Sequence, residues 1–326
     1  FFNDTATTEI YTLSLHDALP ISTPLPRRST AGIARTVRRL AAGTALMPSR
    51  KRRSRMTGLA LDSTQLDRYS RHIILDEVGP AGQQALLEGS ALVVGAGGLG
   101  SPVIQYLAAA GVGRVGIVDD DEVERSNLQR QIVHADADVG RPKAESAAEY
   151  VRRLNPDVDV EPRETRLDAG NAEELVADYD VVVDASDNFG TRYLVNDVAR
   201  LTDTPVAHGS IYKFEGQATT LLPEGPCYRC LFPEAPEPGE IPDCASTGVL
   251  GVLPGTVGCI QATEAVKLLL EAGEVLDGRL LFYDAMDMTF ETVPYRRNPD
   301  CPVCGDDPID SIEGIDYEHG CSVTAD

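Results

Sequence analysis

Positive charge is scarce in this sequence, and long hydrophobic runs are absent. The sequence has 29 Lys and Arg residues, of which 10 precede Met56, and 51 Asp and Glu residues, of which 3 precede Met56. From Met56 onward, 19 basic and 48 acidic residues give a net charge of −29. So acidic a surface repels nucleic acid and anionic membranes and stays hydrated in high salt. No apolar stretch approaches the about 18 residues of a membrane span. We expect a halophilic, soluble, cytoplasmic protein that binds neither nucleic acid nor membrane.

The first 55 residues differ in character from the rest. Residues 3–21 resemble the translation of a sequencing-adapter oligonucleotide joined to a gene, and the Arg-rich run 27–55 ends just before Met56, the expected natural start. A transit peptide is the alternative for that run. We expect a non-native or disordered leader over 1–55, one folded domain over 56–304 and an acidic, disordered tail over 305–326.

The stretch from Ala91 to Lys143 organises the folded part. An apolar strand over 91–94 leads into a glycine-rich turn and a helical pattern, and a second strand over 115–118 ends at Asp119. The turn contains Gly95, Gly97, Gly98 and Gly100. In nucleotide-binding βαβ units, backbone N–H groups of such a turn contact phosphate and the carboxylate binds ribose. The pattern alone fits NAD, FAD or ATP.

Strands and helices alternate along most of the remaining chain. After a helical pair over 63–87 and the nucleotide unit, the pattern predicts helices at 143–154, 172–177 and 191–201 and strands at 158–165, 180–184 and 205–210. It then changes to short strands at 217–222, 279–284 and 289–295, a Pro/Glu-rich crossing loop at 232–243 and a helix at about 255–272. We therefore expect an α/β, Rossmann-like fold with a mostly parallel sheet and an antiparallel extension.

Two cations follow the expected ribose carboxylate. Arg130 lies in the segment 126–131 (SNLQRQ), and Lys143 begins the next helix. A helix N-terminus largely neutralises the two phosphates of a dinucleotide, whereas a triphosphate needs additional cations as a phosphoryl bond breaks. The two side chains favour ATP over NAD.

The seven cysteines argue against a disulfide framework in a cytoplasmic chain. Two C-x-x-C pairs lie 70 residues apart and contain Cys227, Cys230, Cys301 and Cys304. Four thiolates at this spacing are typical of a closed, tetrahedral Zn²⁺ site, which has no open position for catalysis. A redox-active C-x-x-C pair is the alternative.

The other thiols and the imidazoles form no recognisable constellation. Cys259 lies in an apolar run and is expected in the core, and Cys321 lies in the tail and receives no role. His72, His134 and His208 are isolated, without the spacing of metal ligands or of a Ser-His-Asp triad. We expect ordinary packing or surface positions for all three.

Seven motifs in fixed order resemble one family. They are RYSRHIIL (68–75), GAGGLGS (95–101), DDDEVERSNLQRQ (119–131), GRPK (140–143), DASDN (184–188), CYRC (227–230) and CPVC (301–304). Together they resemble the ThiF/MoeB/HesA family of E1-like activating enzymes, the adenylyltransferases of molybdopterin and thiamin biosynthesis. The resemblance covers residues 66–304 and is strongest to the archaeal branch that activates small ubiquitin-like sulfur carriers and protein modifiers.

The resemblance implies that the protein uses ATP as a substrate and Mg²⁺ as a cofactor. The C-terminal glycine carboxylate of a small β-grasp protein ending in Gly-Gly would attack the α-phosphate, which the turn around Gly98 approaches. Asp119 would bind ribose, and Asp187 would position the nucleotide through Mg²⁺. The remaining nucleotide residues would be Ser126, Asn127, Arg130, Lys143 and Asn188. Arg71 matches an arginine that homodimeric members supply to the neighbouring subunit's ATP.

Cys244 follows the Pro/Glu-rich loop and matches a cysteine of the same family. In the branch that handles sulfur carriers, this cysteine forms a thioester or an acyl-disulfide with the activated carboxyl group. A helix beginning nearby would lower the pKa of its thiol. A passive cysteine is the alternative. Because the chain stops soon after Cys304, without the rhodanese domain of some eukaryotic relatives, we expect an external sulfur donor.

Two other functions remain open at this stage. An NAD(P)-dependent oxidoreductase would use the unit from Gly95 to Asp119 but leave Arg130, Lys143 and both cysteine pairs unexplained. A non-catalytic subunit of an activating-enzyme complex would bind ATP without turnover. The sequence does not distinguish molybdopterin synthesis, tRNA thiolation, thiamin synthesis and protein conjugation as the destination of the product.

Overall fold

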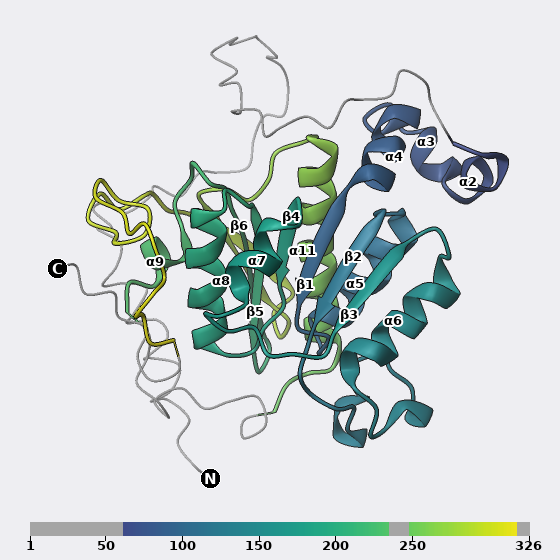
Figure 1. Ribbon diagram of the computed structural model, residues 1–326, viewed down its shortest axis with the longest axis horizontal. Coiled ribbons are helices and arrows are strands. Elements are labelled where there is room, and N and C mark those ends of the chain that lie inside the picture. Colours follow the sequence, from purple (N-terminus) through teal and green to yellow (C-terminus); the bar gives the residue numbers. More distant parts are fainter. Residues whose placement is uncertain (1–60, 235–247, 318–326) are drawn as a thin grey trace, which may run out of the picture. The chain divides into compact units, whose positions relative to one another are not determined.

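A computed structural model of the chain describes residues 61–234 and 248–317. The expectations for the leader over 1–55, for Cys244 and for Cys321 fall outside these residues. Within them, eight strands form one sheet in the order β3-β2-β1-β4-β5-β6-β7-β8 (Figure 1). The strands are β1 (Ser90–Val94), β2 (Arg114–Val118), β3 (Asp159–Arg163), β4 (Val181–Asp184), β5 (Val206–Tyr212), β6 (Glu215–Leu221), β7 (Arg279–Asp284) and β8 (Thr289–Pro294).

The sheet confirms the expected α/β fold class. Strands β1 to β5 pair in parallel, and β6, β7 and β8 continue the sheet in antiparallel pairs. The chain runs from β1 outward to β3 and returns to β4 on the other side of β1. In open α/β sheets, this reversal leaves a crevice beyond the carboxyl ends of the strands, which is where ligands bind.

Helices cover both faces of the sheet, so each face has its own core. The longer helices are α4 (Gly79–Glu88), α5 (Gly100–Ala110), α6 (Lys143–Leu154), α8 (Phe189–Leu201) and α11 (Val252–Leu270), and the shorter α7 spans Ala172–Ala177. Figure 1 shows α7 and α8 in front of the sheet and α5 and α11 behind it. Successive residues of β1 alternate between the two cores: Val93 packs with α5, α6 and α11, whereas Leu92 and Val94 pack with α7 and α8.

Short helices precede the sheet, as the sequence indicated. They are α2 (Ser63–Arg68) and α3 (Ser70–Ile73), which lie with α4 at the end of the sheet where β1 begins (Figure 1). Asp62 caps α2 by accepting the N–H groups of Thr64 and Gln65. Tyr69, between α2 and α3, is buried and accepts a hydrogen bond of 2.8 Å from Nδ2 of Asn155. This buried tyrosine fastens the N-terminal helices to the nucleotide-binding half of the sheet.

The segment after the second cysteine pair is better ordered than its composition suggested. We expected disorder from Gly305 onward, and that expectation is wrong for residues 305–317. Ile312 is 5% exposed in the core beside α8, and the Tyr317 hydroxyl donates to Asp197 at 2.8 Å. The contacts of these two side chains order the segment despite its acidic composition. Residues 318–326 lie outside the described range.

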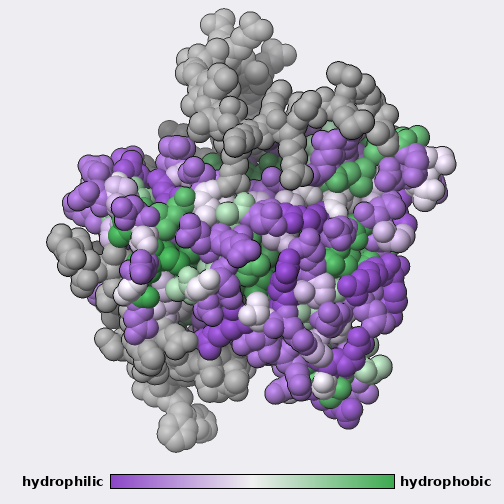
Figure 2. Space-filling view, in the orientation of Figure 1, coloured by the Kyte–Doolittle hydropathy of each residue, from purple (hydrophilic) through white to green (hydrophobic). Residues whose placement is uncertain are grey.

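The described surface agrees with the acidic composition. Hydrophilic side chains dominate the face shown in Figure 2, and hydrophobic groups occur between them in small areas. Within residues 61–234 and 248–317, none of the helices combines the length and apolar character that crossing a bilayer requires.

Candidate nucleotide-binding and metal sites

A cavity of about 310 Å³ opens at the carboxyl ends of β1, β2 and β4, the crevice that the strand order creates. It gathers residues that are up to 117 positions apart in the chain, from Val94 to Ile211. The expected nucleotide residues that line it are Gly95, Gly97, Gly98, Asp119, Arg130, Lys143, Asp187 and Asn188. A glycine turn, several carboxylates and four cationic side chains therefore meet in one cavity, because Arg166 and Arg192 line it together with the expected Arg130 and Lys143.

The glycine turn owes its shape to close backbone approaches. Gly95 has φ +98°, and a Cβ there would lie 2.8 Å from the carbonyl oxygen of Ala185 on the neighbouring strand end. Gly100 is the first residue of α5, and a Cβ at this position would clash with the carbonyl oxygen of Gly95. Gly97 and Gly98, in the turn directly before α5, line the cavity, so the turn lies where the N-terminal end of a helix can bind phosphate.

Asp119 holds this turn as well as facing the cavity. Its carboxylate accepts the N–H of Ala96 at 2.7 Å and that of Asp121 at 2.9 Å. Burial raises the pKa of Asp119, and the nearby Lys143 ammonium opposes that rise. The carboxylate thus has a fixed orientation at the end of β2, where a ribose would lie.

Lys143 and Arg130 occupy the same side of the cavity. Lys143 is 6% exposed, and its Nζ lies 2.7 Å from the exposed carboxylate of Asp121. Nη1 of Arg130 donates to the Ser126 carbonyl oxygen at 3.2 Å. Among the described residues, Asp121 forms the ion pair with Lys143 and Asp119 lies nearby, so a phosphate group entering the cavity would compete with Asp121 for the ammonium.

Four of the expected residues do not line the cavity. Gly100 packs beneath the turn, and Ser126 and Asn127 belong to the short helical turn that supports Arg130. Oδ1 of Asn127 accepts the N–H of Glu124 at 3.1 Å, which fixes that turn. Arg71 is exposed on α3, at the opposite end of the sheet from the cavity (Figure 1). A direct role for these four in binding stays a prediction.

The loop between β4 and α8 lines the cavity with residues 185–188. Asp187 and Asn188 are exposed along its rim, and Oδ1 of Asn188 caps α8 by accepting the N–H of Thr191 at 2.9 Å. Two buried residues beneath the loop escaped the sequence analysis as a pair. Asp184 and His208 are 2% and 3% exposed, and Oδ2 and Nδ1 lie 2.7 Å apart.

The other two expected histidine positions agree with ordinary packing. His134 is buried, and its Nε2 lies 2.9 Å from the carbonyl oxygen of Ala96, so Nε2 donates and Nδ1 accepts from Ser146. Burial lowers the pKa of His134, which keeps the ring neutral and this assignment fixed. His72 bonds to Gln83 through Nδ1. No motif in the sequence signalled that His134 supports the glycine turn.

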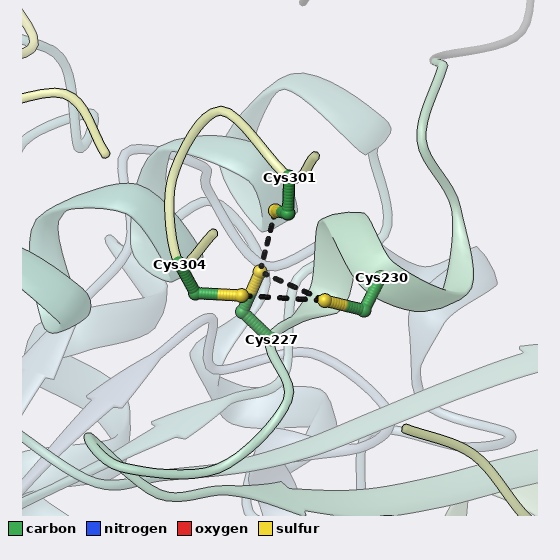
Figure 3. A group of neighbouring side chains, drawn as sticks. All are labelled: Cys227, Cys230, Cys301 and Cys304. Atoms are coloured by element: carbon green, nitrogen blue, oxygen red, sulfur yellow. Dashed lines mark hydrogen bonds between the residues drawn. The ribbon is translucent and has the colours of Figure 1, made fainter. Parts of the chain in front are cut away.

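The four expected metal ligands meet in one cluster. The sulfur atoms of Cys227, Cys230, Cys301 and Cys304 all lie within 4.8 Å of one another (Figure 3). The separations include 3.5 Å for Cys227–Cys301, 3.3 Å for Cys230–Cys304 and 4.0 Å for Cys227–Cys230. Zn–S bonds of about 2.3 Å in a tetrahedron place sulfurs about 3.8 Å apart, so the cluster has the dimensions to hold a metal ion.

The four cysteines are available as metal ligands. All four thiols are free rather than paired in disulfides. The N–H of Asn298 donates to the sulfur of Cys230 at 3.3 Å, a bond that favours the thiolate form of this residue. Cys259, by contrast, is only partly buried on α11, so its expected core position is not reached.

A fully buried ion pair supports the first cysteine pair. Arg229, inside the C-x-x-C segment, bonds through Nε and Nη2 to both carboxylate oxygens of Asp197 on α8, at 2.9 and 2.7 Å. Both side chains are 0% exposed. The Tyr317 hydroxyl also bonds to this carboxylate. The cysteine segment, α8 and the C-terminal segment therefore share one buried carboxylate.

These features define the class of protein. A Rossmann-like strand order, a glycine turn at a helix N-terminus and two cations over a carboxylate-lined cavity are those of a nucleotide-binding α/β protein. Comparison with known proteins then identifies the family. The ThiF family model matches residues 69–303, and the chain belongs to the ThiF family.

Characterised relatives share most of this chain. A Haloferax volcanii protein named SAMP-activating enzyme E1 is 74% identical over 268 residues, which cover 82% of this chain and 99% of that protein. The sulfur carrier protein adenylyltransferase of Thermus thermophilus is 55% identical over 265 residues, covering 79% and 97%. The crystal structure of E. coli MccB with ATP has a TM-score of 0.65 over 75% of each chain at 20% identity, which shows a common fold.

Proposed function

We propose that this protein is an E1-like adenylyltransferase that activates the C-terminal carboxylate of a small ubiquitin-like or sulfur-carrier protein with ATP. One observation carries the proposal: the glycine turn, Asp119, Arg130, Lys143 and Asp187 all line a single cavity. The names of the two relatives, an activating enzyme and an adenylyltransferase, support the same reaction. We assign the adenylation domain to residues 56–304, and the family match over 69–303 supports these bounds.

The proposed reaction needs positioning and charge neutralisation more than covalent help from the protein. A carboxylate oxygen of the carrier bonds to the α-phosphorus, and the bond from that phosphorus to the bridging oxygen breaks. Pyrophosphate leaves with the electron pair, and an acyl-adenylate remains. Lys143 and Arg130 would neutralise the leaving phosphates, while the N–H groups around Gly98 hold the α-phosphate and Asp119 holds ribose.

The cavity also offers ligands for the Mg²⁺ that accompanies ATP. Asp187 is an exposed carboxylate on the rim, and the carboxylate oxygens of residues 119–121 lie within 4.8 Å of one another. Mg²⁺ in phosphoryl-transfer sites binds one or two carboxylates together with phosphate oxygens. We propose that Asp187 supplies the protein ligand and that Mg²⁺ neutralises phosphate charge beside it.

We propose Zn²⁺ for the four-cysteine cluster. The sulfur separations suit a tetrahedral ion, and four thiolates leave no position for a substrate. When bound, the ion would join the segment after β6 to the segment after β8 and contribute to folding stability. Its role is structural, since the cluster is not among the residues that line the nucleotide cavity.

Apolar side chains beside the cavity suit the docking of a folded carrier. They lie where the β5–β6 turn, the β7–β8 turn and the segment before α11 meet. Two backbone hydrogen bonds hold these segments together: the N–H of Ala285 donates to the Phe214 carbonyl oxygen, and the N–H of Leu250 donates to the Lys213 carbonyl oxygen. Those at least 38% exposed are Phe214, Leu250, Val252, Met286, Met288 and Phe290. Ile211 of β5 lines the cavity itself. A carrier docked there could extend its Gly-Gly tail to the α-phosphate.

Transfer after adenylation would use Cys244, which lies outside the described residues. We propose that its thiolate displaces AMP from the acyl-adenylate and forms a thioester. In the alternative route, an external persulfide displaces AMP to give an acyl-disulfide, and the Cys244 thiolate then exchanges into that disulfide and releases the donor as a thiolate. We also propose a cytoplasmic location, because the named relatives act on sulfur carriers and protein modifiers. Either sulfur transfer or protein conjugation could consume the product.

Carrier-dependent exchange of pyrophosphate into ATP tests the function. With Gly-Gly-ending small proteins from the same genome, we expect exchange by the unaltered chain and a loss of about 100-fold or more in Lys143→Ala or Asp187→Ala. Arg153→Ala is the control, since Arg153 is exposed in the last turn of α6 and does not line the cavity. Cys244→Ser should keep exchange and lose transfer to the final acceptor. Absence of both AMP and pyrophosphate with every carrier, at salt levels that keep the protein folded, would refute the proposal.

A further inference from the structure

A buried hydrogen-bonded pair, Asp184 and His208, lies directly beneath the nucleotide cavity. Asp184 ends β4, His208 is its register partner in β5, and both are at most 3% exposed. The Asp184 carboxylate accepts Nδ1–H of His208 at 2.7 Å, the Ser186 hydroxyl at 2.6 Å and the Ser186 N–H at 3.1 Å. These three bonds compensate the cost of burying the charge. Although burial tends to raise the pKa of Asp184, the bonds from His208 and Ser186 bring it below its ordinary value.

The hydrogen-bond pattern of Asp184, Ser186 and His208 excludes a hydrolytic triad. An ionised carboxylate only accepts hydrogen bonds, so His208 carries its proton on Nδ1. Ser186 donates to Asp184 rather than to the imidazole, so the histidine does not serve as the base for this hydroxyl. The other side of the His208 ring packs edge-on against Tyr228, with ring centroids 4.9 Å apart. What the carboxylate controls is the course of the backbone at Ser186.

That backbone is the floor of the nucleotide cavity. Ser186 leads directly to Asp187 and Asn188 on the rim, and the preceding residue, Ala185, packs its carbonyl against Gly95. The loop therefore touches the phosphate-binding turn on one side and carries the proposed Mg²⁺ ligand on the other. A rotation of the Asp184 carboxylate would release both donors of Ser186 and loosen the loop.

Joining the two strands does not require His208. Nε2 of Gln261, on α11, donates to the carbonyl oxygens of Asp184 at 2.6 Å and Ala207 at 3.1 Å, and the two strands also pair through their backbones. The strand ends are thus tied independently of the imidazole. The bond from His208 acts on the side chain of Asp184 alone, where it fixes the direction in which the carboxylate faces Ser186.

We infer that His208 is a positioning residue for ATP: it orients Asp184, which in turn holds the Ser186–Asn188 loop in its nucleotide-binding conformation. The inference rests on the proposed function for the identity of the nucleotide. His208 touches no reacting atom, and its effect reaches ATP through the loop. Its loss should therefore weaken the binding of ATP, while the carrier protein, which docks elsewhere, should bind as before.

Two substitutions separate orientation from packing. His208→Asn keeps an N–H donor near the position of Nδ1, whereas His208→Leu fills much of the space and removes the donor. We expect His208→Leu to raise the Kd for ATP and the KM for ATP about tenfold or more, with the KM for the carrier unchanged. His208→Asn should stay within about threefold of the unaltered protein. Thr219→Val is the matched control, because Thr219 faces His208 across β5 and β6 and loses a buried hydrogen bond to Tyr295 instead.

Direct ATP binding without carrier, by calorimetry on folded protein, gives the deciding measurement. If the unaltered protein binds no ATP, the proposed function fails first. If it binds ATP and His208→Leu binds equally well, or if His208→Asn is as weak as His208→Leu, the positioning role is wrong. Should His208→Leu not fold, Ser186→Ala removes one of the three donors to Asp184 and should raise the Kd for ATP severalfold; an unchanged Kd would overturn the inference.

Discussion

At the scale of single residues, Asp119 serves two purposes that depend on one ionisation state. Its carboxylate accepts the N–H groups of Ala96 and Asp121 and faces the cavity where ribose hydroxyls would donate to it. Only the ionised form can accept all of these bonds. Because burial raises the pKa of Asp119, protonation begins at a higher pH than for an exposed aspartate.

ATP affinity should therefore depend on pH through this residue. As the pH falls through the raised pKa of Asp119, the neutral acid loses acceptors for ribose, so we expect the Kd for ATP to rise; above that pKa, the affinity should be constant. Asp119→Asn should bind ATP about tenfold or more weakly and lose most of this pH dependence. Calorimetric titration at a series of pH values measures both. An identical acid-side slope in the variant would assign the titration to another group.

The residues that sequence reasoning missed have partners far away in the chain. Asp184 and His208 are 24 positions apart and meet because β4 and β5 pair in parallel with these two residues in register. His134 reaches Ala96 across 38 positions. Neither contact leaves a local pattern, whereas the glycine turn and the C-x-x-C pairs are local motifs and were recognised. The side chains that support the site therefore required the fold.

At the scale of secondary structure, the alternating apolar pattern located nearly every helix and strand. Helices α6 and α7 have the expected ends, and β1 and β2 begin one residue earlier than expected. The short helix α9 (Tyr228–Leu231), which contains Cys230, was missed because four residues are too few to show a helical periodicity. Its shape follows from tertiary contacts: the N–H of Tyr228 bonds to Asn196, and Arg229 bonds to Asp197.

The four-cysteine cluster joins α9 to the segment after β8, so removal of the metal should weaken the link between them. Purified protein should contain about one Zn²⁺ per chain. Chelation should expose four additional reactive thiols and lower the melting temperature by roughly 10 °C, since structural zinc contributes several kcal/mol. Cys259→Ser is the control and should leave metal content unchanged, because Cys259 lies on α11 outside the cluster. Zinc-free protein with four freely alkylated thiols in its native state would contradict the metal assignment.

At the scale of the whole molecule, the position of Arg71 bears on assembly. Arg71 is exposed on α3. Figure 1 shows α3 at the end of the sheet where β1 begins, whereas the residues that line the nucleotide cavity lie at the carboxyl ends of β1, β2 and β4. Arg71 therefore does not reach the cavity of its own chain. We propose a homodimer in which each chain supplies Arg71 to its partner's ATP, as the family resemblance implies.

Mixing two inactive variants tests this arrangement. Arg71→Ala and Lys143→Ala should each lose about 100-fold or more of the exchange activity as pure proteins. Mixed dimers contain one cavity with an intact Lys143 and a partner with an intact Arg71, so co-expression should restore up to about half the activity per dimer. Arg68→Ala, from the preceding helix, is the control for general loss of charge. No recovery in verified mixed dimers would rule out sharing between subunits.

The buried ion pair of Arg229 and Asp197 has a consequence for how this sequence can change over time. Replacing either member alone leaves the other charge buried and unpaired, which typically lowers the free energy of unfolding by about 3–5 kcal/mol. Replacing both with well-packed apolar residues often leaves the stability unchanged. A lineage can therefore leave this arrangement only by two substitutions in close succession. Both members should consequently be inherited together or lost together among descendants of this chain.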